Sequence, residues 1–168
     1  KFLSILIYPL VRMLLLKRLS NGKEDPKRYQ QKLGHDKIIR PQGKIIWFHA
    51  ASIGEFNAIL PIIRSLPNLN ILVTTVTITA AQIAKNNLPS NAIHQFAPLD
   101  CYNIVKKFIV YWRPDLVIWT ESEFWPNMLV LARKHAKLLL INARITEKSF
   151  SRWRFAKSLA RFMLNNFS

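Results

Sequence analysis

The sequence has few of the residues on which several common kinds of site depend. Its 168 residues include one cysteine, Cys101, which excludes a disulfide framework and a cysteine-based zinc site and is typical of a reducing compartment. Only four glycines are present, too widely spaced for a glycine-rich phosphate loop of the Walker or dinucleotide-binding type. Acidic residues are also scarce, with 9 Asp and Glu against 25 Lys and Arg, which gives a net charge of +16. Such a basic surface favours an anionic partner: nucleic acid, anionic lipid or a phosphorylated substrate.

The apolar content is high enough for a folded domain. Half of the residues are apolar, which argues against disorder in spite of the charge. A chain of this length can bury one core but is too short for two full domains. We therefore expect one main domain with a basic surface.

The amino-terminal segment has the pattern of a membrane-associated helix. Residues 2–16 form an apolar run, interrupted by a proline and an arginine, that is shorter than the roughly 20 apolar residues of a membrane span. On a helix, Ser4, Tyr8 and Arg12 would form one polar stripe beside an apolar face, as in helices that lie in a membrane interface. We therefore predict an amphipathic, membrane-contacting helix over residues 1–19. A core helix, a signal peptide and a true span are the alternatives, although no small-residue cleavage site follows.

The next segment is polar and basic. Residues 20–43 contain glycine, proline and many cationic side chains, which is typical of a solvated linker. Each cation near an anionic leaflet would add about 1 kcal/mol of attraction. The chain is thus predicted to consist of the helix, this linker and a domain over residues 44–168.

From residue 44 onward, short apolar runs alternate with stretches of helical periodicity. This alternation is typical of βαβ units in a parallel sheet, and near-continuous apolar strands are expected where helices cover both faces. The predicted fold class is therefore α/β with a parallel sheet, and Asp100 is expected to cap the third helix. The predicted strands cover 44–50, 70–76, 92–96, 115–120 and 137–143. The predicted helices cover 55–66, 79–88, 101–112 and 124–136, and helical spacing recurs over 149–165.

Polar residues gather where the predicted strands end. In open parallel sheets, ligands bind beyond the carboxyl ends of the strands, so these residues are the candidates for a site. They are His49, Ser52, Gly54 and Glu55 after the first strand, Thr75 and Thr77 after the second, Glu121, Glu123, Trp125 and Asn127 after the fourth, and Asn142 and Arg144 after the fifth.

Glu55 and Ser52 allow a limited set of roles. Glu55 stands at the start of a predicted helix, where it is either an acid stabilised by the helix dipole or a general base that takes a proton from an attacking hydroxyl. Ser52 has no adjacent His–Asp partner, and the G-x-S-x-G motif is absent, which excludes a serine hydrolase.

The other polar residues also allow two interpretations each. Glu121 and Glu123 either hydrogen-bond sugar hydroxyls or support the structure, because no nearby His or Asp completes a metal site. His49 is either a structural residue or part of the site. Asn142 and Arg144 either clamp a carboxylate or phosphate, or belong to a capping loop with an exposed arginine.

Several of these residues resemble the motifs of a known family. The run Trp47-Phe-His49-Ala-Ala-Ser52-Ile-Gly54-Glu55 resembles the W-x-H-A-A-S-x-G-E motif of 3-deoxy-D-manno-octulosonic acid (Kdo) transferases. The stretch Arg113-Pro-Asp115, followed by Glu121-Ser-Glu123-Phe-Trp125-Pro126-Asn127, resembles their R-P-D…E-x-E-x-W-P-N pattern. Shorter resemblances follow the family order at 28–34, 74–79, 98–100, 141–144 and 149–150. Mild departures are Lys32 for the frequent Arg, Ala80 for Gly and Thr146 for Ser.

The resemblance implies a fold, an activity and a location. The fold would be the Rossmann-like, acceptor-binding, amino-terminal half of a GT-B glycosyltransferase, and the donor-binding carboxyl-terminal domain would be missing from this chain. The activity would be inverting transfer of Kdo from CMP-Kdo to a lipid A precursor, in lipopolysaccharide biosynthesis at the cytoplasmic face of the inner membrane. It implies no metal and no cofactor.

The resemblance also implies roles for individual residues. Glu55 would be the general base, and Glu121 or Glu123 would support the acceptor or the oxocarbenium-like charge. The residues implied to bind substrate are His49, Ser52, Gly54, Thr75, Thr77, Trp125, Asn127, Asn142 and Arg144.

Two rival functions remain at this point. The chain could be an isolated or decayed acceptor half that binds membrane and lipid A but transfers no sugar alone. A nucleic-acid-binding protein is suggested only by the charge, and no helix-turn-helix, RNP or zinc pattern supports it. We therefore expect no nucleic-acid partner.

Overall fold

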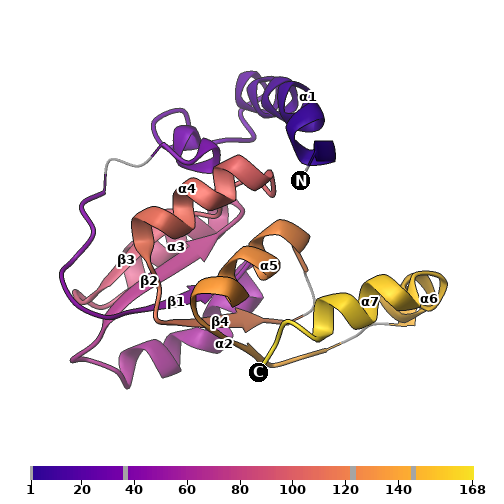
Figure 1. Ribbon diagram of the computed structural model, residues 1–168. Helices are drawn as coiled ribbons and strands as arrows, with labels where there is room; N and C mark the ends of the chain where they lie inside the picture. Colours follow the sequence, from indigo (N-terminus) through magenta and orange to yellow (C-terminus); the bar gives the residue numbers. More distant parts are fainter. Residues whose placement is uncertain (1, 36–37, 122–123, 145–146) are drawn as a thin grey trace.

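The computed structural model describes residues 2–35, 38–121, 124–144 and 147–168 and contains a five-stranded parallel sheet between helices (Figure 1). The strand order is β3-β2-β1-β4-β5, and every neighbouring pair is parallel. This confirms the predicted α/β class. The strands are β1 (Ile45–His49), β2 (Asn70–Thr75), β3 (Ala92–Phe96), β4 (Leu116–Thr120) and β5 (Lys137–Ile141).

The helices cover the two faces of the sheet in pairs. Phe48 of β1 points to the face where α2 and α3 pack, and Trp47 points to the face where α4 and α5 pack. Since both faces are covered, the central strands are buried almost throughout, which explains their near-continuous apolar sequences. The helices are α2 (Ile53–Arg64), α3 (Ile78–Asn87), α4 (Tyr102–Trp112) and α5 (Pro126–His135).

Asp100 caps a different helix from the predicted one. The N-cap of α4 is Cys101, which makes no side-chain capping bond. The Asp100 carboxylate instead accepts the backbone N–H groups of Asn127 and Met128 at 3.1 and 2.8 Å, at the start of α5. The N-cap of α5, Trp125, has no side-chain acceptor, so a carboxylate from a distant loop supplies one.

The predicted amino-terminal helix is present and longer than its apolar run. Helix α1 (Phe2–Ser20) lies beside α4, at one end of the molecule (Figure 1). Leu15 is buried, whereas Leu10, Met13, Leu14 and Leu16 are 44–60% exposed. Among the helices in the described part of the chain, none is long and apolar enough to cross a membrane.

The segment predicted as a solvated linker is partly buried. Glu24, Gln31 and Lys32 are at most 8% exposed, and the 3₁₀ helix η1 (Tyr29–Leu33) lies against β3, an edge strand. The Gln31 side-chain oxygen accepts the N–H of Phe96 at 3.0 Å, and Arg28 donates to the carbonyl of His94 at 2.9 Å. The expectation of a fully solvated linker is therefore wrong for this part, because its polar side chains bond β3.

The helical tail forms two helices beyond the opposite edge of the sheet. Helix α6 (Glu147–Phe155) is followed by α7 (Lys157–Leu164), and the pair projects from the domain on the side away from α1 (Figure 1). Met163 is buried in the core formed with α4 and α5, and the Ser168 N–H donates to the Leu138 carbonyl of β5 at 2.8 Å.

Candidate functional site

The carboxyl ends of the parallel strands lie together at one edge of the sheet, the carboxyl edge. The turn from β1 into α2 lies at this edge. Ser52 is the N-cap of α2: its hydroxyl accepts the Glu55 N–H at 3.3 Å and donates to one Glu55 carboxylate oxygen at 3.1 Å. The other carboxylate oxygen accepts the Ala51 N–H at 2.8 Å. This arrangement is a variant of the capping box, in which the carboxylate accepts the N–H of the residue before the N-cap. Glu55, 6% exposed, thereby closes the amino end of the helix.

Gly54 lies in the first turn of the same helix, and its backbone does not require glycine. A Cβ atom added to Gly54 would have the Ser52 hydroxyl oxygen as its nearest neighbour, at 3.9 Å. This distance is an ordinary van der Waals contact, so a side chain would fit at this position. Gly54 is exposed at the surface of the turn.

His49 ends β1 and is fully buried. Its Nδ1 lies 2.9 Å from the Thr74 hydroxyl, which also accepts the indole N–H of Trp47 at 2.8 Å. The His49 ring lies 4.1 Å from the Trp119 ring, and Nε2 has no hydrogen-bond partner. Burial lowers the pKa of His49 to about 3, so the imidazole is neutral at physiological pH.

Thr75 and Thr77, at the end of β2, both have structural partners. The Thr75 hydroxyl lies 2.9 Å from Nε2 of His94, and the Thr77 hydroxyl caps α3 by accepting the Ala80 N–H at 3.2 Å. Arg28 lies 2.8 Å from Nδ1 of His94. Because a guanidinium only donates, His94 accepts at Nδ1 and donates from Nε2 to Thr75. Burial, and then the charge of Arg28, lower the pKa of His94 to about 3.

The two buried histidines predict that acid destabilises the fold. Between about pH 6.5 and 3, the unfolded chain binds protons at His49 and His94 that the folded chain does not bind. Stability is therefore fully present above pH 6.5 and falls with decreasing pH, by up to about 1.4 kcal/mol per pH unit for each histidine. Urea unfolding between pH 7 and 5 measures this slope. His94→Gln is expected to reduce the slope, and an equal slope in this variant and in the unmodified chain would contradict the prediction.

Glu121 and Asn142 meet at the ends of the adjacent strands β4 and β5. The Asn142 side-chain amide donates to a Glu121 carboxylate oxygen at 3.4 Å. Both residues have left-handed backbones, with φ of 59° and 48°, a conformation that non-glycine residues rarely adopt. Such strain is concentrated at functional sites in proteins, and here it turns two polar side chains toward each other. Glu123 lies outside the described residues.

An apolar hollow of about 260 Å³ adjoins this pair. It lies between the ends of β4 and β5 and the α6–α7 pair, and it is lined by Phe124, Leu140, Trp153 and Leu164. Glu121 and the exposed Arg144 also line it, so charged groups stand beside an apolar cavity. Such a combination suits an amphipathic molecule.

Trp125 and Asn127 flank the start of α5. The Asn127 amide donates to the carbonyl of Asp100 at 2.7 Å and to its carboxylate at 3.2 Å, which occupies both amide hydrogens. The Trp125 indole N–H is buried without a partner. Burial raises the pKa of Asp100, although the N–H groups that it accepts act in the opposite direction.

An ion pair beside β2 was not anticipated from the sequence. Lys32, nearly fully buried, donates to Glu24 at 2.5 Å and to the Val76 carbonyl at 2.9 Å, and Arg18 donates to the other Glu24 oxygen at 2.6 Å. Burial lowers the pKa of Lys32, and Glu24 opposes this effect. The sequence signal was weak, because Glu24 is one of three acidic residues in the basic segment 20–43 and nothing distinguishes it from the other two.

The predicted site residues therefore separate into two groups. Glu55 and Ser52 in the β1–α2 turn, and Glu121, Asn142 and Arg144 beyond β4 and β5, lie at the carboxyl edge. Thr75 and Asn127 bond other protein groups. In the described ranges, no three His, Cys, Asp or Glu side chains are grouped as a metal site.

Comparison with known proteins identifies the family. Residues 27–168 match a family model described as "3-Deoxy-D-manno-octulosonic-acid transferase (kdotransferase)". The chain belongs to the Kdo transferase family. The resemblance noted in the motifs is thereby confirmed.

Individual Kdo transferases agree with this assignment. The chain is 40% identical over 152 residues to the "Probable 3-deoxy-D-manno-octulosonic acid transferase, mitochondrial" of Arabidopsis thaliana, covering 88% of this chain and 34% of that one. It is 38% identical over 171 residues to the 3-deoxy-D-manno-octulosonic acid transferase of Rickettsia bellii, covering 99% of this chain and 41% of that one. The Haemophilus influenzae transferase is 34% identical over 138 residues, 75% and 32% of the two chains. The chain thus spans about two fifths or less of these relatives.

Proposed function

We propose that this chain is the acceptor-binding half of an inverting transferase that moves Kdo from CMP-Kdo to a lipid A precursor. The observation that carries the proposal is the buried Glu55 carboxylate at the end of the central strand, in a member of the Kdo transferase family. Parallel α/β sheets bind ligands at this edge. A donor-binding part, which the proposal assigns to the remaining length of the relatives, would supply CMP-Kdo.

In the proposed reaction, an acceptor hydroxyl attacks the anomeric carbon of Kdo. The bond from that carbon to the CMP phosphate oxygen breaks, CMP leaves with the bonding electrons, and the configuration inverts. Glu55 takes the hydroxyl proton as general base, from its position in the first turn of α2. Glu121, held by Asn142, and Arg144 bind the acceptor at the neighbouring strand ends.

The proposal places the protein at the cytoplasmic face of the inner membrane. Exposed Leu10, Met13 and Leu14 on α1 offer an apolar surface, and Lys17 and Arg18 in its last turn offer positive charge. Apolar burial and attraction to anionic lipid together support interfacial binding. The acceptor, an anionic glycolipid, would be reached from the same surface.

A chimeric enzyme tests the proposal. The chain replaces the matching segment of the Rickettsia bellii transferase, and Kdo transfer from CMP-Kdo to a lipid A precursor is measured. We expect transfer by the chimera and none by the 168-residue chain alone. A folded chimera without transfer would contradict the proposed function. Transfer by the chain alone would contradict its assignment as one half.

A further inference from the structure

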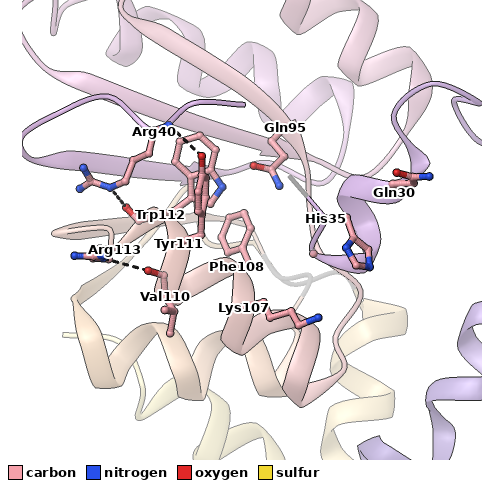
Figure 2. Close-up of a pocket in the computed structure, with 11 residues that line it drawn as sticks. Gln30, His35, Arg40, Gln95, Lys107, Phe108, Val110, Tyr111, Trp112 and Arg113 are labelled. Atoms are coloured by element: carbon pink, nitrogen blue, oxygen red, sulfur yellow. Dashed lines mark hydrogen bonds between the residues drawn. The ribbon is translucent and has the colours of Figure 1, made fainter. Parts of the chain in front are cut away.

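A second hollow lies beside the second half of α4, where the helix faces η1 and β3. It has a volume of about 810 Å³ and is formed by the second half of α4, the end of η1, Arg40 and Gln95 of β3 (Figure 2). None of the predicted site residues lines it. The hollow is therefore separate from the proposed transferase site.

The charged side chains that the described residues bring to this hollow are positive. Arg40, Lys107 and Arg113 line it, and no acidic side chain of the described residues does. Arg40 donates to the carbonyls of Trp112, Pro41 and Gly43, which are neutral, so its charge is not compensated by these bonds. The two ion pairs seen among the described residues are both made by Glu24, away from the hollow.

Gln95 brings an unusual polar group to the same hollow. Its side chain is 1% exposed, and its carbonyl oxygen is buried without a hydrogen-bond partner. Leaving a buried polar atom unpaired is unfavourable, and nothing in the described structure compensates for it. An amide both accepts and donates, so a ligand hydroxyl would satisfy this group.

Aromatic side chains form the middle of the hollow. Figure 2 shows Tyr111, Trp112 and Phe108 between the two arginines, Arg40 and Arg113, and Lys107. The guanidinium groups of both arginines point away from Gln95. Tyr111 is held in place by the backbone of residue 40, whose N–H donates to its hydroxyl at 3.2 Å. Of the three aromatic lining residues, Tyr111, 40% exposed, offers its surface to a ligand, whereas Phe108 and Trp112 are 3% and 0% exposed.

From these observations we propose that the hollow binds a phosphorylated polyol. The phosphate contacts the cationic side chains, chiefly Lys107, and a hydroxyl of the ligand hydrogen-bonds the Gln95 amide. The ligand is either a soluble polyol phosphate or the headgroup of an anionic phospholipid. Lys107 also lines an adjoining hollow of about 560 Å³ with Tyr8 of α1, so a headgroup at this place would lie beside the proposed membrane helix.

Calorimetric titration of the 168-residue chain with glycerol 1-phosphate tests the proposal. At constant ionic strength we expect saturable 1:1 binding, weaker binding of inorganic phosphate and none of glycerol. Lys107→Gln is expected to weaken glycerol 1-phosphate binding at least about tenfold. Lys85→Gln, which removes an exposed cation of α3, is expected to leave it unchanged. Equal effects of both variants, or no saturation, would show general attraction to a basic protein and overturn the proposal.

Gln95→Leu provides an independent readout. Removing the unpaired amide is expected to raise the melting temperature of the free protein by about 2–4 °C. The same change should reduce glycerol 1-phosphate affinity to that of inorganic phosphate. A lower melting temperature with unchanged affinity would show a purely structural amide and contradict its assigned role. If this variant does not fold, the Lys107→Gln comparison decides.

Competition distinguishes the two sources of the ligand. Vesicles of phosphatidylglycerol displace bound glycerol 1-phosphate if the hollow takes a lipid headgroup, whereas phosphatidylcholine vesicles do not. Saturable binding that neither vesicle displaces supports the site with a soluble ligand. Equal displacement by both vesicles would show that the phosphate is not recognised and would overturn the proposal.

Discussion

Glu55→Gln in the chimeric transferase is expected to reduce turnover by about 10²–10⁴-fold, the usual contribution of a general base. Glutamine cannot take the proton from the attacking hydroxyl, but its carbonyl oxygen can still accept the Ala51 N–H. The amino end of α2 therefore stays closed, and the stability loss should be about 1 kcal/mol or less. Turnover and melting temperature are measured on the same preparation.

The matched control for this change is Glu147→Gln. Glu147 is another first-turn acid, in α6, and is exposed. Both changes remove one negative charge from a helix start, so they share any effect on the helix dipole. We expect turnover of the Glu147→Gln chimera to stay near that of the unmodified chimera. If Glu55→Gln behaves in the same way, Glu55 has only the capping role and another base must be found.

Lys32→Met is expected to lower the free energy of unfolding by about 3–5 kcal/mol, because breaking a buried ion pair leaves one charge uncompensated. Glu24 is 3% exposed and would keep only Arg18, whose side chain is 55% exposed, as its charged partner. The Val76 carbonyl would also lose its donor. Urea denaturation measures the change, with Lys27→Met, at an exposed position, as the control expected within about 0.5 kcal/mol of the unmodified chain.

A double variant separates the ion pair from the packing of the lysine chain. Replacing both partners, in Glu24→Leu with Lys32→Met, removes the uncompensated charge and is expected to recover more than half of the lost stability. Additive losses in the double variant would mean that Glu24 and Lys32 are not energetically coupled. The packing of the Lys32 side chain would then account for the destabilisation.

The sheet could be predicted because its sequence signals are local. Each strand is a short apolar run, and the observed β3 has the predicted bounds, 92–96, while the other strands begin and end within two residues of theirs. Because these runs place apolar side chains on both faces of the sheet, they predicted that helices cover both faces. The pattern of charged residues did not predict which side chains of residues 20–43 are buried. A lysine that is buried beside a glutamate has the same sequence signal as a solvated one.

The site was only partly predictable because strand-end residues can bond ligands or the protein. Thr75 lies at the end of β2 as expected, yet its hydroxyl lies against His94, 19 positions away. Asp100 precedes α4 but caps α5 by accepting the N–H of Asn127, 27 positions further along. The hydrogen-bond partners of Thr75 and Asp100 depend on which loops lie close together in the fold. The spacing of residues along the chain does not show this. The strained backbones of Glu121 and Asn142 are equally invisible in the sequence.

The contacts of η1 with β3 have a consequence for aggregation. An unpaired edge strand presents free N–H and C=O groups, on which another chain can add a strand. In this domain the outward groups of Phe96 and His94 are occupied by the side chains of Gln31 and Arg28. A chain shortened to begin at residue 44 would keep the whole sheet but expose this edge to intermolecular pairing. The basic segment before the sheet therefore protects this edge strand from pairing with another chain.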